Sequence, residues 1–103
     1  MKIFVLYRLK DGVSFDTYKR WSLGEDQPTL RVHTDVARFS VYATTAADAS
    51  TAPYDVVEEI EVADLEAWTR VTESSDVKAL GPAFEGFVDP NSVCILLGEE
   101  IAE

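Results

Sequence analysis

The order of the apolar segments constrains the fold of this chain more than any other feature. A strand-like run at residues 3–9 is followed by an amphipathic stretch at 14–32 and by two more strand-like runs at 36–45 and 54–62. A second amphipathic stretch begins at about residue 64, and a last strand-like run covers residues 92–97. This order reads βαββαβ and occupies nearly all of the 103 residues. It predicts a single α+β domain, residues 1–103, in which a four-stranded antiparallel sheet carries both helices on one face.

The predicted arrangement is ferredoxin-like, and it leaves the second face of the sheet uncovered. The first strand is apolar on both faces, with Ile3, Val5 and Tyr7 on one side and Phe4 and Leu6 on the other. A strand of this kind lies in the centre of a sheet that is covered on both sides. Because the chain supplies helices for one face only, we expect a second copy to cover the other face, which gives a homodimer with the dimeric α/β-barrel architecture.

The charge of the chain argues against two classes of partner. Nineteen acidic residues against nine basic ones give a net charge of −10. A field of that sign repels phosphate backbones and anionic headgroups, so we expect neither nucleic acid nor membrane as a partner. No apolar run approaches the roughly 20 residues that cross a bilayer, and the first residues lack the pattern of a secretory signal. We therefore expect a cytoplasmic protein.

The metal-binding and phosphate-binding patterns are missing as well. The chain has one cysteine, Cys94, and one histidine, His33, which are too few for a zinc or iron–sulfur site. It also has no glycine-rich phosphate loop. The sequence therefore predicts no metal and no cofactor, and it predicts that Cys94 is a small buried apolar residue within the last strand.

The first helical stretch carries several candidate residues. Ser14 is a typical N-cap, and Phe15, Tyr18 and Trp21 follow at helical spacing, where they either pack on the sheet or contact an aromatic ligand. We expect Gly24 to end or bend this helix and a short helix to restart near Pro28. Asp26, with its neighbour Glu25, is then either an N-cap, which we favour for one of the two, or part of a carboxylate pair that acts as a base. His33 would lie at the C-terminal end of the short helix, where it is either a general base, for which the ordinary pKa of histidine is suitable, or an exposed residue at the helix end.

The middle strands contribute further polar candidates. Arg38 and Tyr42 share the polar face of the strand at 36–45, where they are oxyanion or carboxylate donors if that face lines the barrel and ordinary surface residues if it faces solvent. Glu58 is a carboxylate within the apolar row of the next strand. If buried, its pKa should be raised so that it could act as an acid or base; alternatively it pairs with Arg38 across the sheet.

Three segments resemble the REDY-like proteins of the HapK type, within the dimeric α/β-barrel superfamily. They are MKIFVLYRLKDGVSFDTYKRW at residues 1–21, WSLGEDQPTLRVHTDVARFSVYAT at 21–44 and GPAFEGFVDPNSVCILLGEEI at 81–101. The resemblance spans the whole chain and implies the ferredoxin-like fold and a role in the biosynthesis of prodiginine, a tripyrrole pigment. The related EthD-type proteins tend to carry a histidine shortly after the tryptophan of the first helix, a stretch in which this chain has Glu25 and Asp26 instead.

The resemblance implies a small aromatic or pyrrole-type metabolite as the ligand. The first functional hypothesis is a cofactor-independent enzyme that cyclises or condenses a pyrrole-type intermediate in the barrel, and the second is a binding protein or chaperone for an unstable intermediate without chemistry of its own. A cofactor-free monooxygenase is a third reading. For the first hypothesis the candidate catalytic residues are His33, Asp26 and Arg38, and the candidate substrate-binding residues are Tyr7, Tyr18, Trp21, Tyr42 and Glu58.

Overall fold

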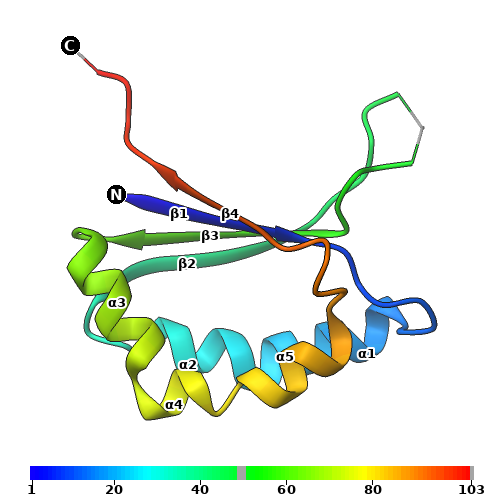
Figure 1. Ribbon diagram of the computed structural model, residues 1–103, viewed down its shortest axis with the longest axis horizontal. Coiled ribbons are helices and arrows are strands. Elements are labelled where there is room, and N and C mark those ends of the chain that lie inside the picture. The colour runs from blue at the N-terminus through cyan, green and yellow to red at the C-terminus, as the bar shows by residue number, and fades with distance from the viewer. Residues whose placement is uncertain (49–50, 103) are drawn as a thin grey trace.

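Four strands form one antiparallel sheet, and all the helices lie against the same face of it (Figure 1). The computed structural model describes residues 1–48 and 51–102, so of the predicted domain 1–103 only residues 49, 50 and 103 lie outside the described residues. The elements are β1 (Lys2–Tyr7), α1 (Phe15–Trp21), the π-helical turn η1 (Ser22–Asp26), α2 (Gln27–Arg31), β2 (Val36–Ala43), β3 (Val56–Val62), α3 (Leu65–Glu73), α4 (Ser75–Lys78), α5 (Gly81–Phe87) and β4 (Cys94–Gly98).

The strand order confirms the ferredoxin-like fold. The sheet runs β2-β3-β1-β4, and β1 pairs with β3 on one side and β4 on the other. Ile3 of β1, for example, lies opposite Ile60 of β3 and Leu97 of β4. The prediction of a central first strand is therefore confirmed. Among the described residues no helix is both long and apolar enough to cross a membrane.

The core lies between the sheet and the helix layer. Alternate residues of β1 and β3 point toward the helices and are buried, among them Ile3, Val56 and Ile60. From the helices, Tyr18, Leu30 and Val71 are buried against them. The alternation of the strands thus directs one row of side chains from each central strand into the same layer.

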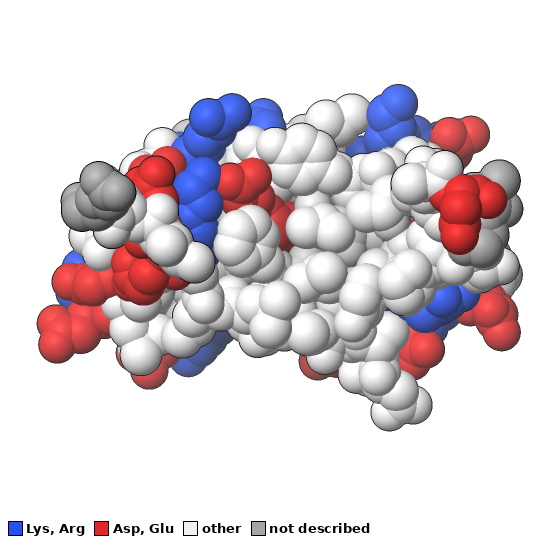
Figure 2. Space-filling model, turned by 90° about the horizontal axis from the view of Figure 1, so that it is seen from above, with Lys and Arg blue, Asp and Glu red and all other residues white. Residues whose placement is uncertain are grey.

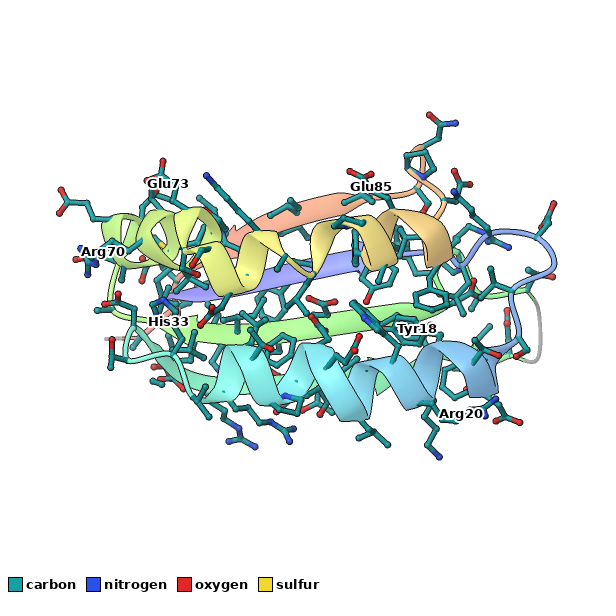
Figure 3. The ribbon with its side chains drawn as sticks, turned by 90° about the horizontal axis from the view of Figure 1, so that it is seen from below. Tyr18, Arg20, His33, Arg70, Glu73 and Glu85 are labelled. Carbon is teal, nitrogen blue, oxygen red and sulfur yellow. The ribbon has the colours of Figure 1, made fainter. Side chains whose placement is uncertain are left out.

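The first helix does not stop at Gly24, because α1, η1 and α2 form one continuous helical rod (Figure 3). Ser14 caps its start by accepting a hydrogen bond from the Thr17 backbone N–H at 3.2 Å, as predicted. The π-helical turn inserts a residue without interrupting the rod, so the predicted helix end at Gly24 and the predicted restart near Pro28 are wrong. The expected stripe is also incomplete, because Phe15 is exposed while Tyr18 and Trp21 are buried.

The helices that follow β3 complete the helix layer. In α3 the buried residues are Ala67 and Val71, whereas Leu65 is exposed. Asp64 caps this helix by accepting a hydrogen bond from the Ala67 backbone N–H at 2.8 Å. Residues 81–87 form the regular helix α5, in which Pro82 stands in the first turn, where a missing N–H costs nothing.

The second face of the sheet is open in the single chain. Phe4 and Leu6 of β1 lie opposite Leu96 and Cys94 of β4 on this face, and Leu96 is exposed while Cys94 is half-buried rather than buried as predicted. Figure 2 views the molecule from this side and shows a broad uncharged area with charged side chains gathered mostly toward the two ends. Apolar surface of this extent is typical of a face that another molecule covers.

Candidate functional site

A cluster of buried polar side chains lies between the sheet and the first helical rod. The Tyr7 hydroxyl of β1 donates a hydrogen bond to Glu58 Oε2 of β3 at 2.5 Å, and the hydroxyls of Tyr7 and Tyr18 are 2.5 Å apart. Because Tyr7 has one hydroxyl proton and gives it to Glu58, Tyr18 is the donor in the second bond. In Figure 3, which looks through the helix layer, Tyr18 extends from α1 toward the middle of the sheet.

Glu58 reaches this cluster because of the strand period. It belongs to the inward row of β3 with Val56, Ile60 and Val62, and only 8% of it is exposed. Burial raises the pKa of the Glu58 carboxyl, the negative charge of Asp26 raises it further, and the Tyr7 hydrogen bond lowers it in part, which leaves the pKa at about 8. The predicted rise in pKa is confirmed, and Glu58 is predominantly protonated at pH 7.

The alternative pairing of Glu58 with Arg38 is wrong. Glu58 lies opposite Val41 in β2, whereas Arg38 lies opposite Glu61 on the other face of the sheet. A buried carboxyl of this kind accepts a phenol hydrogen bond instead of an ion pair, which is consistent with its being neutral.

Asp26 is the second buried carboxyl of the cluster. It has helical backbone angles and makes no capping hydrogen bond, so the favoured role of an N-cap is wrong for Asp26. It is 7% exposed, its Oδ2 atom has no hydrogen-bond partner among the described residues, and burial raises its pKa to about 6. Asp26 has the lower pKa of the two carboxyls and therefore loses its proton first, and such a divergence of two neighbouring carboxyls is typical of acid–base pairs.

The two carboxyls line one cavity of about 200 Å³. The rest of the wall is almost entirely apolar and comes from the sheet, the first helical rod and the C-terminal helices: Leu30, Phe39, Ile60, Trp68, Val77, Leu80, Gly81 and Phe84. A cavity of about 150 Å³ with such walls can hold benzene, so this one can hold a single aromatic ring. Its acid–base groups are the carboxyls of Asp26 and Glu58, and the apolar wall around them strengthens their electrostatic effect.

The two phenols of the cluster stay neutral at physiological pH. Burial is the first cause that raises the pKa of both Tyr7 and Tyr18, and the charge of Glu58 adds to it. Neutral phenols act as hydrogen-bond donors rather than as bases. The Tyr7 hydroxyl thus fixes Glu58 Oε2 by its hydrogen bond, and Tyr18 contacts Tyr7 from the other side.

The remaining predicted residues lie elsewhere. His33 is near the far end of the molecule from Tyr18, beside Arg70 (Figure 3), and its Nδ1 accepts a hydrogen bond from the Asp35 backbone N–H at 3.1 Å. Tyr42 is exposed on β2, and Trp21 is buried against Tyr18 and Phe87, with ring centroids 5.9 and 5.5 Å away. The structure therefore brings together Asp26, Glu58, Tyr7 and Tyr18, and it does not bring His33, Arg38 or Trp21 to the cavity.

Two buried polar residues, Ser22 and Gln27, were not predicted from the sequence. Ser22 and Gln27 face inward next to the cluster, and the Gln27 Nε2 atom donates to Ser22 Oγ at 3.0 Å. The π-helical turn shifts the phase of the helix so that positions 22, 26 and 27 share the buried face. The available signal was the absence of large apolar residues from Gly24 to Thr29, a pattern that also indicates the end of a helix.

Among the described residues no group of three or more His, Cys, Asp or Glu side chains is placed to hold a metal ion.

The raised pKa values predict how stability depends on pH. A carboxyl whose pKa is higher in the folded state stabilises the fold fully below its unfolded value, near 4.5 for Glu58, and this contribution disappears as pH rises to about 8. Asp26 acts in the same direction up to about 6. We therefore expect the free energy of unfolding, measured by urea denaturation, to fall by a few kcal/mol between pH 5 and pH 8. Glu58→Gln should remove most of this slope, and an unchanged slope in that variant would contradict the assignment.

Comparison with known proteins places the chain in a family. The family described as REDY-like protein HapK matches residues 1–101. The structure of HapK from Hahella chejuensis is 27% identical, with a TM-score of 0.72 over 100% of this chain and 99% of that one. Among functionally curated proteins, none matches this sequence.

More distant structures share the fold. An EthD family protein from Bacillus halodurans C-125 is 16% identical, with a TM-score of 0.76 over 97% of each chain. A dimeric ferredoxin-like protein of unknown function from Thermobifida fusca YX is 10% identical, with a TM-score of 0.75 over 92% of this chain and 85% of that one. The strand order and the match over residues 1–101 agree, and the chain therefore belongs to the family of REDY-like HapK proteins.

Proposed function

We propose that this protein is a cofactor-independent enzyme that cyclises or condenses a carbonyl compound of single-ring size, with Asp26 as the base and Glu58 as the acid. One observation carries the proposal: two buried carboxyls with raised pKa values line the same apolar cavity. Neither has a cationic partner that would explain its burial as a structural ion pair among the described residues. Burying two unpaired acids is costly, and such costs are typical of functional sites.

The proton transfers follow from the protonation states. Ionised Asp26 removes a proton from the carbon next to the substrate carbonyl, while protonated Glu58 donates a hydrogen bond to the carbonyl oxygen, where negative charge develops. The resulting enolate carbon attacks a second carbonyl carbon and forms the new carbon–carbon bond. The proton held by Asp26 then passes to the new alkoxide, which restores both carboxyls to their starting states.

Two further arguments define the substrate. The cavity of about 200 Å³ encloses one ring, and its walls from Phe39, Trp68 and Phe84 are suited to stacking or edge contact with an aromatic system. Membership of the REDY-like family, which the sequence links by resemblance to prodiginine assembly, supports a pyrrole-type intermediate of that pathway as the natural substrate. The volume of the cavity disfavours two classes of larger substrate, dinucleotides and long acyl chains.

The first test is deuterium exchange at the methyl group of acetophenone, a single-ring ketone, in deuterated buffer. The base step of the mechanism predicts exchange that is faster with the protein than in buffer alone, and proton NMR follows the loss of the methyl signal. Conversion of the pathway intermediate by the purified protein is the corresponding test with the natural substrate.

A non-catalytic binding protein is the second candidate, and the apolar wall of the cavity favours it. Leu30, Phe39, Ile60 and Phe84 would hold an aromatic intermediate whether or not the carboxyls react. Acetophenone that binds in the cavity without any exchange above buffer would support this candidate and contradict the catalytic one.

We also propose that the protein is a homodimer in which the two open sheet faces pack together. Its relatives include dimeric ferredoxin-like proteins, and the open face carries Phe4, Leu6 and Leu96. An interface above about 1,200 Å² of total area is expected for a stable dimer.

Light scattering at micromolar concentration should therefore return twice the monomer mass of 11.4 kDa. Leu96→Glu on the open face should shift the protein toward the monomer, because it would bury an unpaired charge in the interface. Leu65→Glu is the matched control, since Leu65 is similarly exposed but lies on α3. A monomer mass for the parent protein would refute the proposal.

A further inference from the structure

A second cavity, of about 290 Å³, lies between the first helical rod and the edge strand β2, outside the Asp26–Glu58 site. Its lining comes from α1, η1, the start of α2, β2 and one residue of β3: Phe15, Tyr18, Lys19, Ser22, Leu23, Gln27, Val41, Tyr42, Ala43 and Val56. Three of the large apolar or aromatic side chains, Phe15, Leu23 and Tyr42, are 43, 55 and 48% exposed. Exposed apolar groups around an opening are typical of a site that takes up an apolar molecule.

The buried end of this cavity is polar. Ser22 and Gln27 both line it although they are only 2 and 7% exposed. Burying polar groups costs free energy unless they are hydrogen-bonded, and apolar residues at these positions would fill the same space at no such cost. One N–H of Gln27 donates to Ser22 Oγ, which leaves its second N–H and its carbonyl oxygen without a hydrogen bond to another described residue. The polar end can therefore both donate to and accept from a ligand.

A chain of hydrogen bonds leads from the wall of the second cavity to the Asp26–Glu58 cavity. Tyr18 lines the second cavity, and its hydroxyl donates to Tyr7, which donates to Glu58. Both donors point the same way, and such chains strengthen cooperatively. A ligand that contacts Tyr18 in the second cavity should therefore be felt at the Glu58 carboxyl.

We propose that the second cavity is a binding site for a neutral single-ring molecule that carries a hydroxyl or ring N–H group, and that its occupancy is transmitted to Glu58 through Tyr18 and Tyr7. The site differs from the Asp26–Glu58 cavity, with which it shares no lining residue. The role assigned to Glu58 rests on the proposed function, whereas the binding site stands on its own geometry.

The test is a titration with phenol and with toluene, which have nearly the same size and differ by the hydroxyl group. Phenol should change the backbone amide NMR signals of residues 18–27 and 41–43, and it should bind about fivefold more tightly than toluene, the scale of one net hydrogen bond. Ser22→Ala should reduce this preference. Ala43→Phe, in which a large side chain fills the cavity from its exposed wall, should abolish binding, and circular dichroism would verify that both variants are folded.

Transmission is measured at the side-chain carboxyl carbon signal of Glu58 in carbon-13-labelled protein. Phenol should shift this signal in the parent protein, and Tyr18→Phe, which keeps the ring but removes the hydroxyl, should cut the shift by at least about half. Equal binding of toluene, or phenol-dependent changes confined to residues 30, 39, 60 and 68, would overturn the proposal. Binding of phenol as described without any exchange of acetophenone would leave the second site intact and contradict only the proposed enzyme.

Discussion

Replacing Asp26 with asparagine is expected to slow the deuterium exchange of acetophenone by about 100-fold or more, the scale of losing a general base. Asparagine is nearly isosteric but cannot accept a proton at pH 7. Asp26 makes no capping bond, and its Oδ2 atom has no partner among the described residues, so the substitution removes no hydrogen bond at that atom. The free energy of unfolding should therefore stay equal or rise, because the cost of burying a charge disappears.

Two further variants make this result specific. Glu58→Gln should also slow the exchange, because it removes the acid while it keeps an acceptor for the Tyr7 hydroxyl. Glu85→Gln is the matched control, since Glu85 is an exposed carboxylate on α5 (Figure 3). His33→Ala tests the base predicted from the sequence: a loss of activity in that variant together with full activity in Asp26→Asn would show that the base is His33 and not Asp26.

Replacing Trp21 with alanine is expected to lower the free energy of unfolding by roughly 3–5 kcal/mol, the range for a large aromatic side chain removed from a core. Trp21 is 8% exposed and packs between Tyr18 and Phe87, so its loss opens a void under the first helical rod. Urea denaturation monitored by circular dichroism measures the change.

Trp68→Ala serves as the comparison for this prediction. Trp68 is only half-buried and lines the Asp26–Glu58 cavity, so its removal enlarges an existing space and should cost less than the removal of Trp21. A loss below about 1 kcal/mol for Trp21→Ala would show that its indole does not contribute to the core.

The first helical rod shows which features of a helix can be predicted from residues close in sequence and which cannot. Ser14 was predictable as an N-cap because capping depends on residues close in sequence. The continuation of the helix through Gly24 was not predictable, since glycine favours an end and Pro28 favours a start. Packing of Trp21 and Leu30 against the same sheet stabilises the rod over this stretch, and the π-helical turn corrects the phase between them.

In the candidate site, too, some residues could be predicted from the sequence and others could not. Glu58 could be identified from sequence because a carboxylate in an apolar row of period two must point into the core. Its hydrogen-bond partner Tyr7 could not be identified from sequence, because Tyr7 and Glu58 lie on the neighbouring strands β1 and β3, whose register depends on tertiary pairing. The sequence pattern indicates loop or cap residues at Ser22, Asp26 and Gln27. Polar residues at buried positions interrupt the apolar stripe of a helix, and the same interruption occurs where a helix ends.

By itself, the sequence determined the βαββαβ order, the central place of β1 and the inward direction of Glu58, because strand and helix periodicities are local properties of the chain. Only the tertiary structure decided that the first helix continues, that Asp26 and Glu58 line one cavity, and that Arg38 and His33 lie away from it. The physical reason is that the pKa values and contacts of these groups depend on burial between the sheet and the helix layer, which residues distant in sequence create together.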